Sequence, residues 1–309
     1  MTKAALKKTF YSNGKLLLIG EYTVIDGSEA LAVPTVYGQH LEIESYDPEI
    51  LKWESYDADA KQWYKASLSY QTIHDNRRTG HSVTDTLIDI LHHAHKANPS
   101  ILSAGSGYKA VNKLTFSRNW GLGSSSTLIN NIAQWFEIDA YELLAKSFGG
   151  SGYDIACAQY DTPVIYQIKE GKPFVTPINF NPAFLDKLYF VYLNKKQNTR
   201  SSVATYRENA KDTKELNKKV NVIIDTAAST EDFGLFCRLL DEHSALMSAP
   251  LQMPTIKESL FPDFNGTLKS LGAWGGDFIL AAANENPEDY FRLKGFETII
   301  PYKEMILGS

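Results

Sequence analysis

The sequence contains few cysteines and no long apolar run. Its 309 residues include only two cysteines, Cys157 and Cys237, too few for a disulfide-rich scaffold or a four-cysteine zinc site. No apolar stretch approaches the roughly 20 residues that a membrane-spanning helix needs. The apolar segment that follows Lys7 and Lys8 is too short for a signal peptide and runs into Glu21. These absences favour a soluble, reduced, cytoplasmic protein.

Positive charge is also scarce. Lysine and arginine number 31 against 36 aspartates and glutamates, so the formal net charge is −5. A broadly basic face for nucleic acid is therefore not expected, and neither nucleic acid nor a membrane is predicted as a partner. Hydrophobic residues make up 43% of the chain, which is enough for a sizeable core. The length suits one large domain or two ordinary ones.

The common signatures of nucleotide-binding proteins and hydrolases are missing from the sequence. No Walker A pattern occurs, and the Gly121–Gly123 pair lacks the third glycine of a dinucleotide-binding fingerprint. The protein-kinase HRD and DFG motifs, the GxSxG elbow and the HExxH helix are absent as well. Any phosphate-binding loop must therefore be of another type.

Hydrophobic periodicity predicts strands and helices in irregular alternation. Residues 15–19 are predicted as a buried strand, 30–36 and 39–45 as two further strands, and 46–72 as an exposed hairpin. Helices are expected at 82–97, 127–138, 140–148, 203–228 and 231–247, and extended segments at 163–180, at 187–194 and within 266–283. This order contains both hairpins and crossovers, which indicates an α+β fold rather than a doubly wound sheet.

Two further features concern histidine and cysteine. His92, His93 and His95 lie on one predicted helix without a carboxylate partner at a fixed spacing, so a solvated helix surface is favoured over a metal site. Cys157 stands in an apolar context and is expected to be a small core residue.

Three glycine-centred segments carry the candidate chemistry. In the first, GKLLLIGEY, Lys15 and Glu21 bracket a buried strand, so both side chains can reach a cleft at its ends. The alternative is a strand between two turns with solvated charges. The third segment, GAWGGD at 272–277, again offers a tight loop, with a simple turn into the following strand as the alternative.

The second segment, GLGSSST at 121–127, directly precedes an amphipathic helix. Glycines let the backbone approach a ligand closely, and the unpaired N–H groups of a helix N-terminus attract phosphate. Serine hydroxyls can ligate Mg²⁺ or a phosphate oxygen. The alternative is that these serines only cap the helix. Four consecutive hydroxyl residues exceed what one cap requires, so a phosphate-binding loop is predicted.

Together and in this order, the three segments resemble those of the GHMP kinases, which include galactokinase, homoserine kinase, mevalonate kinase and phosphomevalonate kinase. The resemblance spans roughly residues 10 to 283. GKLLLIGEYTVIDG resembles the first motif of the family, WGLGSSST its phosphate loop, usually GLGSSA, and LGAWGGDFILA its third motif, usually GAGGGG. A fourth segment, GGSGYDIA, resembles the SGxDxA segment that carries the proposed catalytic aspartate. For Asp154 itself the alternative is a helix N-cap.

The resemblance implies a two-domain GHMP kinase fold. Its N-terminal ATP-binding domain, expected at 1–180, would be ribosomal S5 domain 2-like, and its C-terminal domain, expected at 181–309, ferredoxin-like. ATP would bind between the two domains. The implied partners are ATP, Mg²⁺ and a small-molecule substrate, and the chain is expected to be a monomer or a homodimer.

The implied activity is ATP-dependent phosphorylation of a small-molecule hydroxyl or phosphate group, with mevalonate or phosphomevalonate of isoprenoid precursor synthesis as the favoured acceptor. The alternatives are a diphosphomevalonate decarboxylase-like enzyme and a catalytically silent regulator that binds ATP or a metabolite. The residues implied are Asp154 and Lys15 for catalysis, Gly121, Leu122, Gly123, Ser124, Ser125, Ser126 and Gly275 for the cofactor, Glu21, Tyr22 and Arg200 for the substrate, and Ser125 for the metal.

The sequence departs from the family pattern at two positions. Mevalonate kinases often carry a Mg²⁺-binding glutamate where this chain has Leu143, with Glu142 beside it. Trp274 replaces a residue of the third motif that is normally glycine. The second metal ligand is therefore not assigned, and the third loop is expected to be reshaped.

Overall fold

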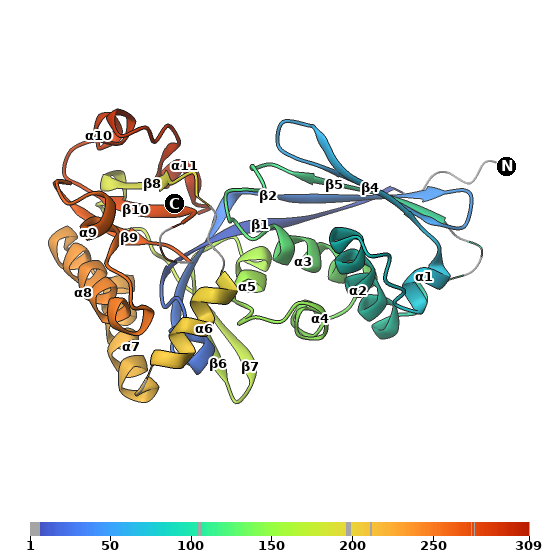
Figure 1. Ribbon diagram of the computed structural model, residues 1–309, viewed down its shortest axis with the longest axis horizontal. Coiled ribbons are helices and arrows are strands. Elements are labelled where there is room, and N and C mark those ends of the chain that lie inside the picture. The colour runs from blue at the N-terminus through green and yellow to red at the C-terminus, as the bar shows by residue number, and fades with distance from the viewer. Residues whose placement is uncertain are drawn as a thin grey trace. The chain divides into compact units, whose positions relative to one another are not determined.

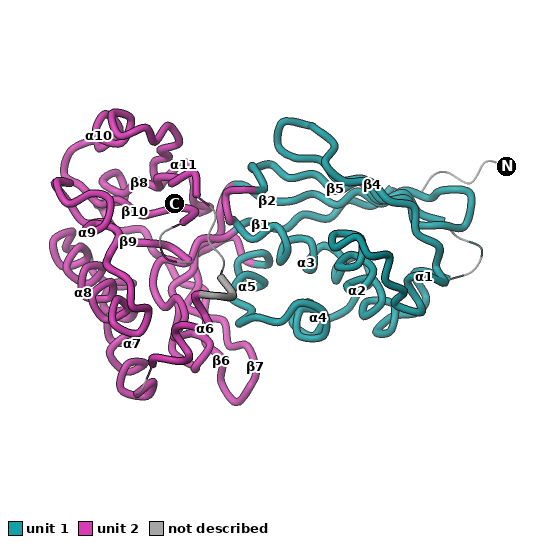
Figure 2. The backbone as a smooth tube through the Cα atoms, in the orientation of Figure 1, with its two compact units in different colours: residues 1–14, 37–118, 122–159 teal, residues 15–36, 119–121, 160–309 magenta. Residues whose placement is uncertain are grey.

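The structure is a computed structural model that describes residues 7–103, 105, 107–195, 199–210, 212–272, 274 and 276–308, with the backbone alone at 199–201. The chain forms two compact units, each discontinuous in sequence (Figure 2). Unit 1 comprises residues 1–14, 37–118 and 122–159, and unit 2 comprises residues 15–36, 119–121 and 160–309. The mixture of strands and helices confirms the α+β class. The expected domain boundary at residue 180 stays a prediction.

Unit 1 is a sheet with helices along one face (Figure 1). Its strands lie in the order β4-β3-β5-β2, and β1 also pairs with β2. The strands are β1 (Lys7–Ile19), β2 (Ala30–Tyr46), β3 (Leu51–Tyr56), β4 (Gln62–Leu68) and β5 (Gly107–Leu114), of which β1 and β2 also contribute residues to unit 2. The helices are α1 (Tyr70–His74), α2 (Ser82–Ala97), α3 (Ser124–Phe136), α4 (Ala140–Ser147) and α5 (Tyr153–Gln159). Sheet and helices share one apolar core that includes Leu41, Trp53, Leu91 and Ile129.

Unit 2 contains an antiparallel sheet in the order β11-β8-β10-β9. Its strands are β8 (Leu188–Tyr192), β9 (Thr267–Ser270), β10 (Phe278–Ala282) and β11 (Ile299–Pro301). A hairpin of β6 (Val164–Lys169) and β7 (Lys172–Pro177) pairs with the start of β2. The helices are α6 (Thr199–Asn209), α7 (Thr213–Ser229), α8 (Phe233–Leu251), α9 (Ile256–Leu260), α10 (Glu288–Leu293) and α11 (Tyr302–Met305), with short 3-10 turns at Thr23–Asp26 and Leu185–Lys187. Helix α8 packs against β9.

The structure corrects three expectations about these elements. The two strands predicted at 30–36 and 39–45 are one continuous strand, β2. Gly38 does not end it; a Cβ there would lie 2.3 Å from the carbonyl oxygen of Ser12, so the glycine permits a close approach of two backbones. The helix predicted at 203–228 is two helices, α6 and α7. The hairpin at 46–72 is present, but Leu51, Trp53 and Leu68 are buried, so it is exposed on one face only.

The histidines of α2 are not a solvated surface. His92 is 7% exposed, and its Nδ1 lies 3.0 Å from the carbonyl oxygen of Ile73. His95 stacks on His74 with ring centroids 3.8 Å apart. Cys157 is fully buried, as expected. Within the described part of the chain, no helix is both long and apolar enough to cross a bilayer.

Candidate functional site

The predicted phosphate loop leads into α3 without a side-chain cap. Gly123 is the N-cap, with a φ of +87°, so the three serines occupy the first three helical positions instead. The alternative that they serve only as caps does not hold. Ser124 and Ser125 are partly exposed. The first N–H groups of a helix lack intrahelical partners, so this 13-residue helix offers donors suited to an anion.

Thr127 and the buried polar side chains around it fix the start of α3. The Thr127 hydroxyl lies 3.2 Å from the carbonyl oxygen of Gly123 and 3.1 Å from the carbonyl oxygen of Ser124. The same hydroxyl donates a hydrogen bond to the side-chain oxygen of Gln39. Asn131 donates to the Gln39 carbonyl at 2.9 Å. The loop is therefore held by hydrogen bonds from its own helix and from strand β2.

Helix α5 carries Asp154 and packs against α3. The Gly152 carbonyl accepts the first bonds of α5, from Ile155 at 3.0 Å and Ala156 at 3.3 Å, so Gly152 is at the cap position and Asp154 lies inside the first turn. The alternative that Asp154 caps the helix is thus not what the structure shows. Asp154 is partly exposed. Both the loop serines and Asp154 belong to unit 1.

In unit 2, Lys15 lies beside the segment that leads into the loop. Its Nζ donates to the carbonyl of Gly121 at 3.3 Å. The same segment is anchored by the Tyr192 hydroxyl, which donates to the Asn119 carbonyl at 2.9 Å, and by Trp120, whose ring meets Phe278 edge-on with centroids 5.6 Å apart. Within unit 2, Lys15 therefore contacts the segment that precedes the loop, and its catalytic assignment stays a prediction.

Asp277 also lies against Gly121, and no role was expected for it from the sequence. A Cβ on Gly121 would lie 2.4 Å from Asp277 Oδ2, so a side chain at position 121 would require this carboxylate to shift. Asp277 has a φ of +51°, which is uncommon for a residue other than glycine. Its N–H donates to the Lys195 carbonyl at 2.7 Å, and its carbonyl accepts from the Leu193 N–H at 2.8 Å. The feature of the sequence that could have indicated a role is the acidic residue at the end of the glycine-rich segment 272–277.

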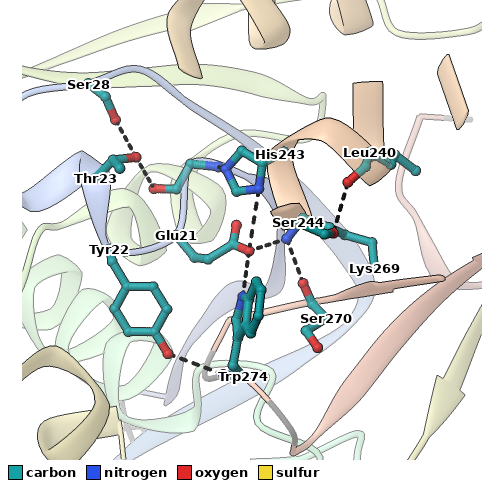
Figure 3. Close-up of polar contacts among 11 residues, drawn as sticks. Glu21, Tyr22, Thr23, Ser28, Leu240, His243, Ser244, Lys269, Ser270 and Trp274 are labelled. Carbon is teal, nitrogen blue, oxygen red and sulfur yellow. Dashed lines mark hydrogen bonds and ion pairs between the residues drawn. The ribbon is translucent and has the colours of Figure 1, made fainter. Parts of the chain in front are cut away.

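Glu21 is not at a cleft surface within unit 2 but in a buried polar cluster, which Figure 3 shows. The Oε1 atom of Glu21 pairs with Lys269 Nζ and accepts a 3.1 Å bond from Trp274 Nε1. His243 Nδ1 lies 3.8 Å from the same oxygen, and His243 Nε2 accepts a 3.3 Å bond from the Gly20 N–H. Glu21 is 2% exposed, and Lys269 and His243 are fully buried. The first and third glycine segments are thus joined through Glu21 and Trp274.

Burial and the contacts within the cluster together set its ionisation. Desolvation pushes the pKa of Glu21 upward, but the charges and hydrogen bonds of Lys269, His243 and Trp274 outweigh it and leave the pKa below its ordinary value. Burial lowers the pKa of Lys269 against the attraction of Glu21. Burial also lowers the pKa of His243 to about 4, so the imidazole is neutral at pH 7. A neutral ring agrees with Nε2 acting as an acceptor.

Tyr22 lies beside this cluster with internal partners of its own. It is 5% exposed and has a φ of +66°. Its hydroxyl accepts a 3.1 Å bond from the Trp274 N–H, and its ring stacks on Tyr206 at 5.7 Å. Tyr206 in turn donates to Asp26 Oδ2 at 2.8 Å and belongs to α6. The substrate-binding assignments of Glu21 and Tyr22 stay predictions, since both side chains are buried here.

The remaining predicted residues are placed as follows. Leu122 is fully buried, so only its backbone can contact a nucleotide. Arg200 lies in α6, where only its backbone is described, and Gly275 lies outside the described residues. Leu143 is 2% exposed within the apolar core of unit 1. In the described ranges, no three His, Cys, Asp or Glu side chains gather in a way that could hold a metal ion.

Comparison with solved structures finds kinases over nearly the whole chain. The Methanococcus jannaschii mevalonate kinase matches with a TM-score of 0.71 at 18% identity, over 96% of this chain and 97% of that one. A Lactococcus lactis galactokinase complexed with galactose matches with a TM-score of 0.73 at 12% identity, over 98% and 94%. A Streptococcus pneumoniae phosphomevalonate kinase in complex with phosphomevalonate and AMPPNP matches with a TM-score of 0.67 at 15% identity, over 98% of both chains.

These matches confirm that the chain has the fold of the GHMP kinases, as the three glycine segments predicted. No protein-family sequence model matches the chain, and no curated protein matches it by sequence. At identities of 12 to 18%, the fold is shared but the acceptor is not fixed by the comparison.

Proposed function

We propose that the protein is an ATP-dependent small-molecule kinase of the GHMP type, which phosphorylates a hydroxyl or phosphate group. The observation that carries the proposal is the glycine-capped N-terminus of α3, with Lys15 bound to the carbonyl of Gly121 at its approach. Together with the shared fold, this arrangement supports binding of nucleotide phosphates.

The residues present fit a nucleotide with its divalent cation. Loop N–H groups suit phosphate oxygens, and the partly exposed hydroxyl of Ser125 suits Mg²⁺. When bound, ATP supplies the phosphoryl group and Mg²⁺ offsets the negative charge of the phosphates. Asp154 accepts or orients the proton of the acceptor hydroxyl. Lys15 stabilises charge on the group in transfer while it holds the loop carbonyl of Gly121.

The favoured acceptor is mevalonate or phosphomevalonate, which places the enzyme in isoprenoid precursor synthesis. Support comes from two resemblances. The first motif has GEY rather than GEH, which is more similar to phosphomevalonate kinase, and the segment 197–202 resembles the hydroxyl-rich loop of the isoprenoid-pathway members of the family. Solved mevalonate and phosphomevalonate kinases are also among the structures with this fold. Both acceptors are anionic, and Arg200 is the cation that the proposal assigns to them.

The experiment is an ATP-consumption assay against mevalonate, phosphomevalonate, diphosphomevalonate, homoserine and hexoses, with product analysis by mass spectrometry. We expect phosphorylated product with one acceptor, and a loss of at least about 10² in kcat for Asp154→Asn with ATP affinity retained. Asp161→Asn serves as the control, because Asp161 lies outside α5 on an exposed turn. Release of CO₂ from diphosphomevalonate would favour a decarboxylase. Tight ATP binding without turnover of any acceptor would favour the silent regulator, and either result would overturn the proposal.

A further inference from the structure

The carboxylate of Asp277 lies at the entry of the predicted phosphate loop. Its Oδ2 and Cγ would lie 2.4 and 2.5 Å from a Cβ on Gly121, so the acid is in contact with the first glycine of the loop. The loop also receives the ammonium of Lys15 on the Gly121 carbonyl. Asp277 also acts on Tyr192: burial raises the pKa of the Tyr192 hydroxyl, and the negative charge of Asp277 raises it further.

An acid at this place is unfavourable for a loop that only binds phosphate. A fixed carboxylate repels the phosphate oxygens of a nucleotide, and it lowers the affinity for that nucleotide unless a cation lies between them. The turn geometry does not require an acid either, because asparagine and glycine accept a positive φ at least as well as aspartate. A divalent cation between the carboxylate and the phosphate oxygens would turn this repulsion into attraction.

The position on α4 at which the family resemblance implies a metal-binding glutamate holds no acid. Leu143, at the position where a metal-binding glutamate would be expected, is 2% exposed in the apolar core of unit 1. Its neighbour Glu142 is bonded to Lys146 at 3.1 Å on the outer side of α4. Leu143 has no carboxylate, and the carboxylate of Glu142 is paired with Lys146.

We propose that Asp277 is a ligand, directly or through water, of the divalent cation that enters with the nucleotide. This inference rests on the proposed function and adds to it a metal-binding residue from the third glycine segment. Carboxylate oxygens are the ligands that Mg²⁺ prefers. Asp277 has a positive φ, and its carboxylate lies against Gly121, so an acid is present at the start of the loop.

The test measures binding of AMPPNP by calorimetry, with Mg²⁺ and with EDTA, for the wild type and Asp277→Asn. Asparagine keeps the size and the preference for positive φ but removes the charge. For the wild type we expect much tighter binding with Mg²⁺ than with EDTA. For Asp277→Asn we expect about tenfold or more weaker binding with Mg²⁺ and equal or tighter binding with EDTA, so that the metal dependence collapses. Asp277→Gly should lose the Mg²⁺ dependence of binding in the same way. This second variant shows that the effect comes from loss of the carboxylate and not from the new asparagine side chain.

Asp289→Asn is the matched control, because it removes one exposed acid from α10 in the same unit. Electron paramagnetic resonance of Mn²⁺ with AMPPNP gives a second readout, in which the bound-metal signal should change for Asp277→Asn and not for the control. An unchanged metal dependence in Asp277→Asn would overturn the inference. Equal losses with Mg²⁺ and with EDTA would also overturn it, since they would mean that Asp277 only shapes the loop. If AMPPNP did not bind to the wild type in either condition, that result would instead contradict the proposed function, and the inference that rests on it would fail as well.

Discussion

Glu21 and Lys269 form an ion pair although they are 248 positions apart and their side chains are only 2% and 0% exposed. Glu21 is in the first glycine segment, and Lys269 is in β9, just before the third. Removal of two charges from water costs several kcal/mol per ion, which the pair recovers only through its mutual attraction and added hydrogen bonds. The pair therefore makes the two segments depend on each other.

The first prediction concerns Lys269→Met, which leaves the Glu21 carboxylate buried without its main partner. A change of this kind typically costs about 3–5 kcal/mol. We expect a decrease of that order in the free energy of unfolding, measured by urea denaturation at pH 7. The double variant Glu21→Leu/Lys269→Met should recover most of the loss, because apolar replacement of a buried pair is often nearly neutral. A single variant within 1 kcal/mol of the wild type would contradict the role given to the pair.

The second prediction concerns the pH dependence of stability. The folded pKa of His243 is about 4, below the ordinary value of 6.5, so between these values the unfolded chain binds the proton and the folded chain does not. Stability should therefore decrease as the pH falls from about 6.5 to about 4, by on the order of 3 kcal/mol for this group. The depressed pKa of Glu21 adds a further loss below its ordinary value of 4.5.

Urea denaturation of the wild type and of His243→Gln at pH 7, 5.5 and 4.5 checks this prediction. Glutamine cannot titrate, so the variant should lose less stability between pH 7 and 4.5 than the wild type does. Parallel pH profiles for the two proteins would show that His243 does not carry the dependence.

The parts of the fold with strong local signals could be predicted from the sequence. The helix at 82–97 follows a clear periodicity, and the loop before α3 is marked by glycines followed by hydroxyl residues. The break expected near Gly38 was wrong because a glycine signals either a turn or a close approach of backbones, and only the partner strand decides between them.

The buried cluster could not be predicted for a related reason. Lys269 and His243 stand in segments where a charged or polar residue is ordinarily solvated, and their burial depends on Glu21, which is distant in sequence. Asp277 was visible as the acid that closes the third segment, but its contact with Gly121 joins two segments that are 156 positions apart (277 − 121). Pairings of this kind arise from tertiary structure and have no local pattern.

The third prediction concerns Tyr206→Phe, which removes the 2.8 Å bond to Asp26 from a fully buried hydroxyl. Hydrogen bonds to charged groups contribute about 1.5–3 kcal/mol, so stability should fall by that order. Because Tyr206 anchors α6, which carries Arg200, we expect a higher KM for the acceptor and an unchanged KM for ATP. Tyr189→Phe, a half-buried tyrosine of β8, is the control. An effect on ATP alone would contradict the proposed link between α6 and the acceptor.

The fourth prediction concerns Gly121→Ala, in which the new methyl group would overlap the Asp277 carboxylate and the backbone would keep a φ of +69°. Gly80→Ala separates the cost of backbone strain from the cost of steric overlap, because Gly80 has a φ of +84° but nothing within 4 Å of its Cβ position. Strain from a positive φ costs about 1–2 kcal/mol, and we expect the free energy of unfolding of Gly80→Ala to decrease only by that amount.

Gly121→Ala should lose more stability than Gly80→Ala and should also weaken AMPPNP binding, measured by denaturation and calorimetry. The double variant Gly121→Ala/Asp277→Gly should regain stability relative to Gly121→Ala, because the overlapping carboxylate is gone, but should not regain Mg²⁺-dependent binding. Equal losses for Gly121→Ala and Gly80→Ala would show that the loop moves freely away from Asp277. In that case the carboxylate would not be a fixed part of the loop entry.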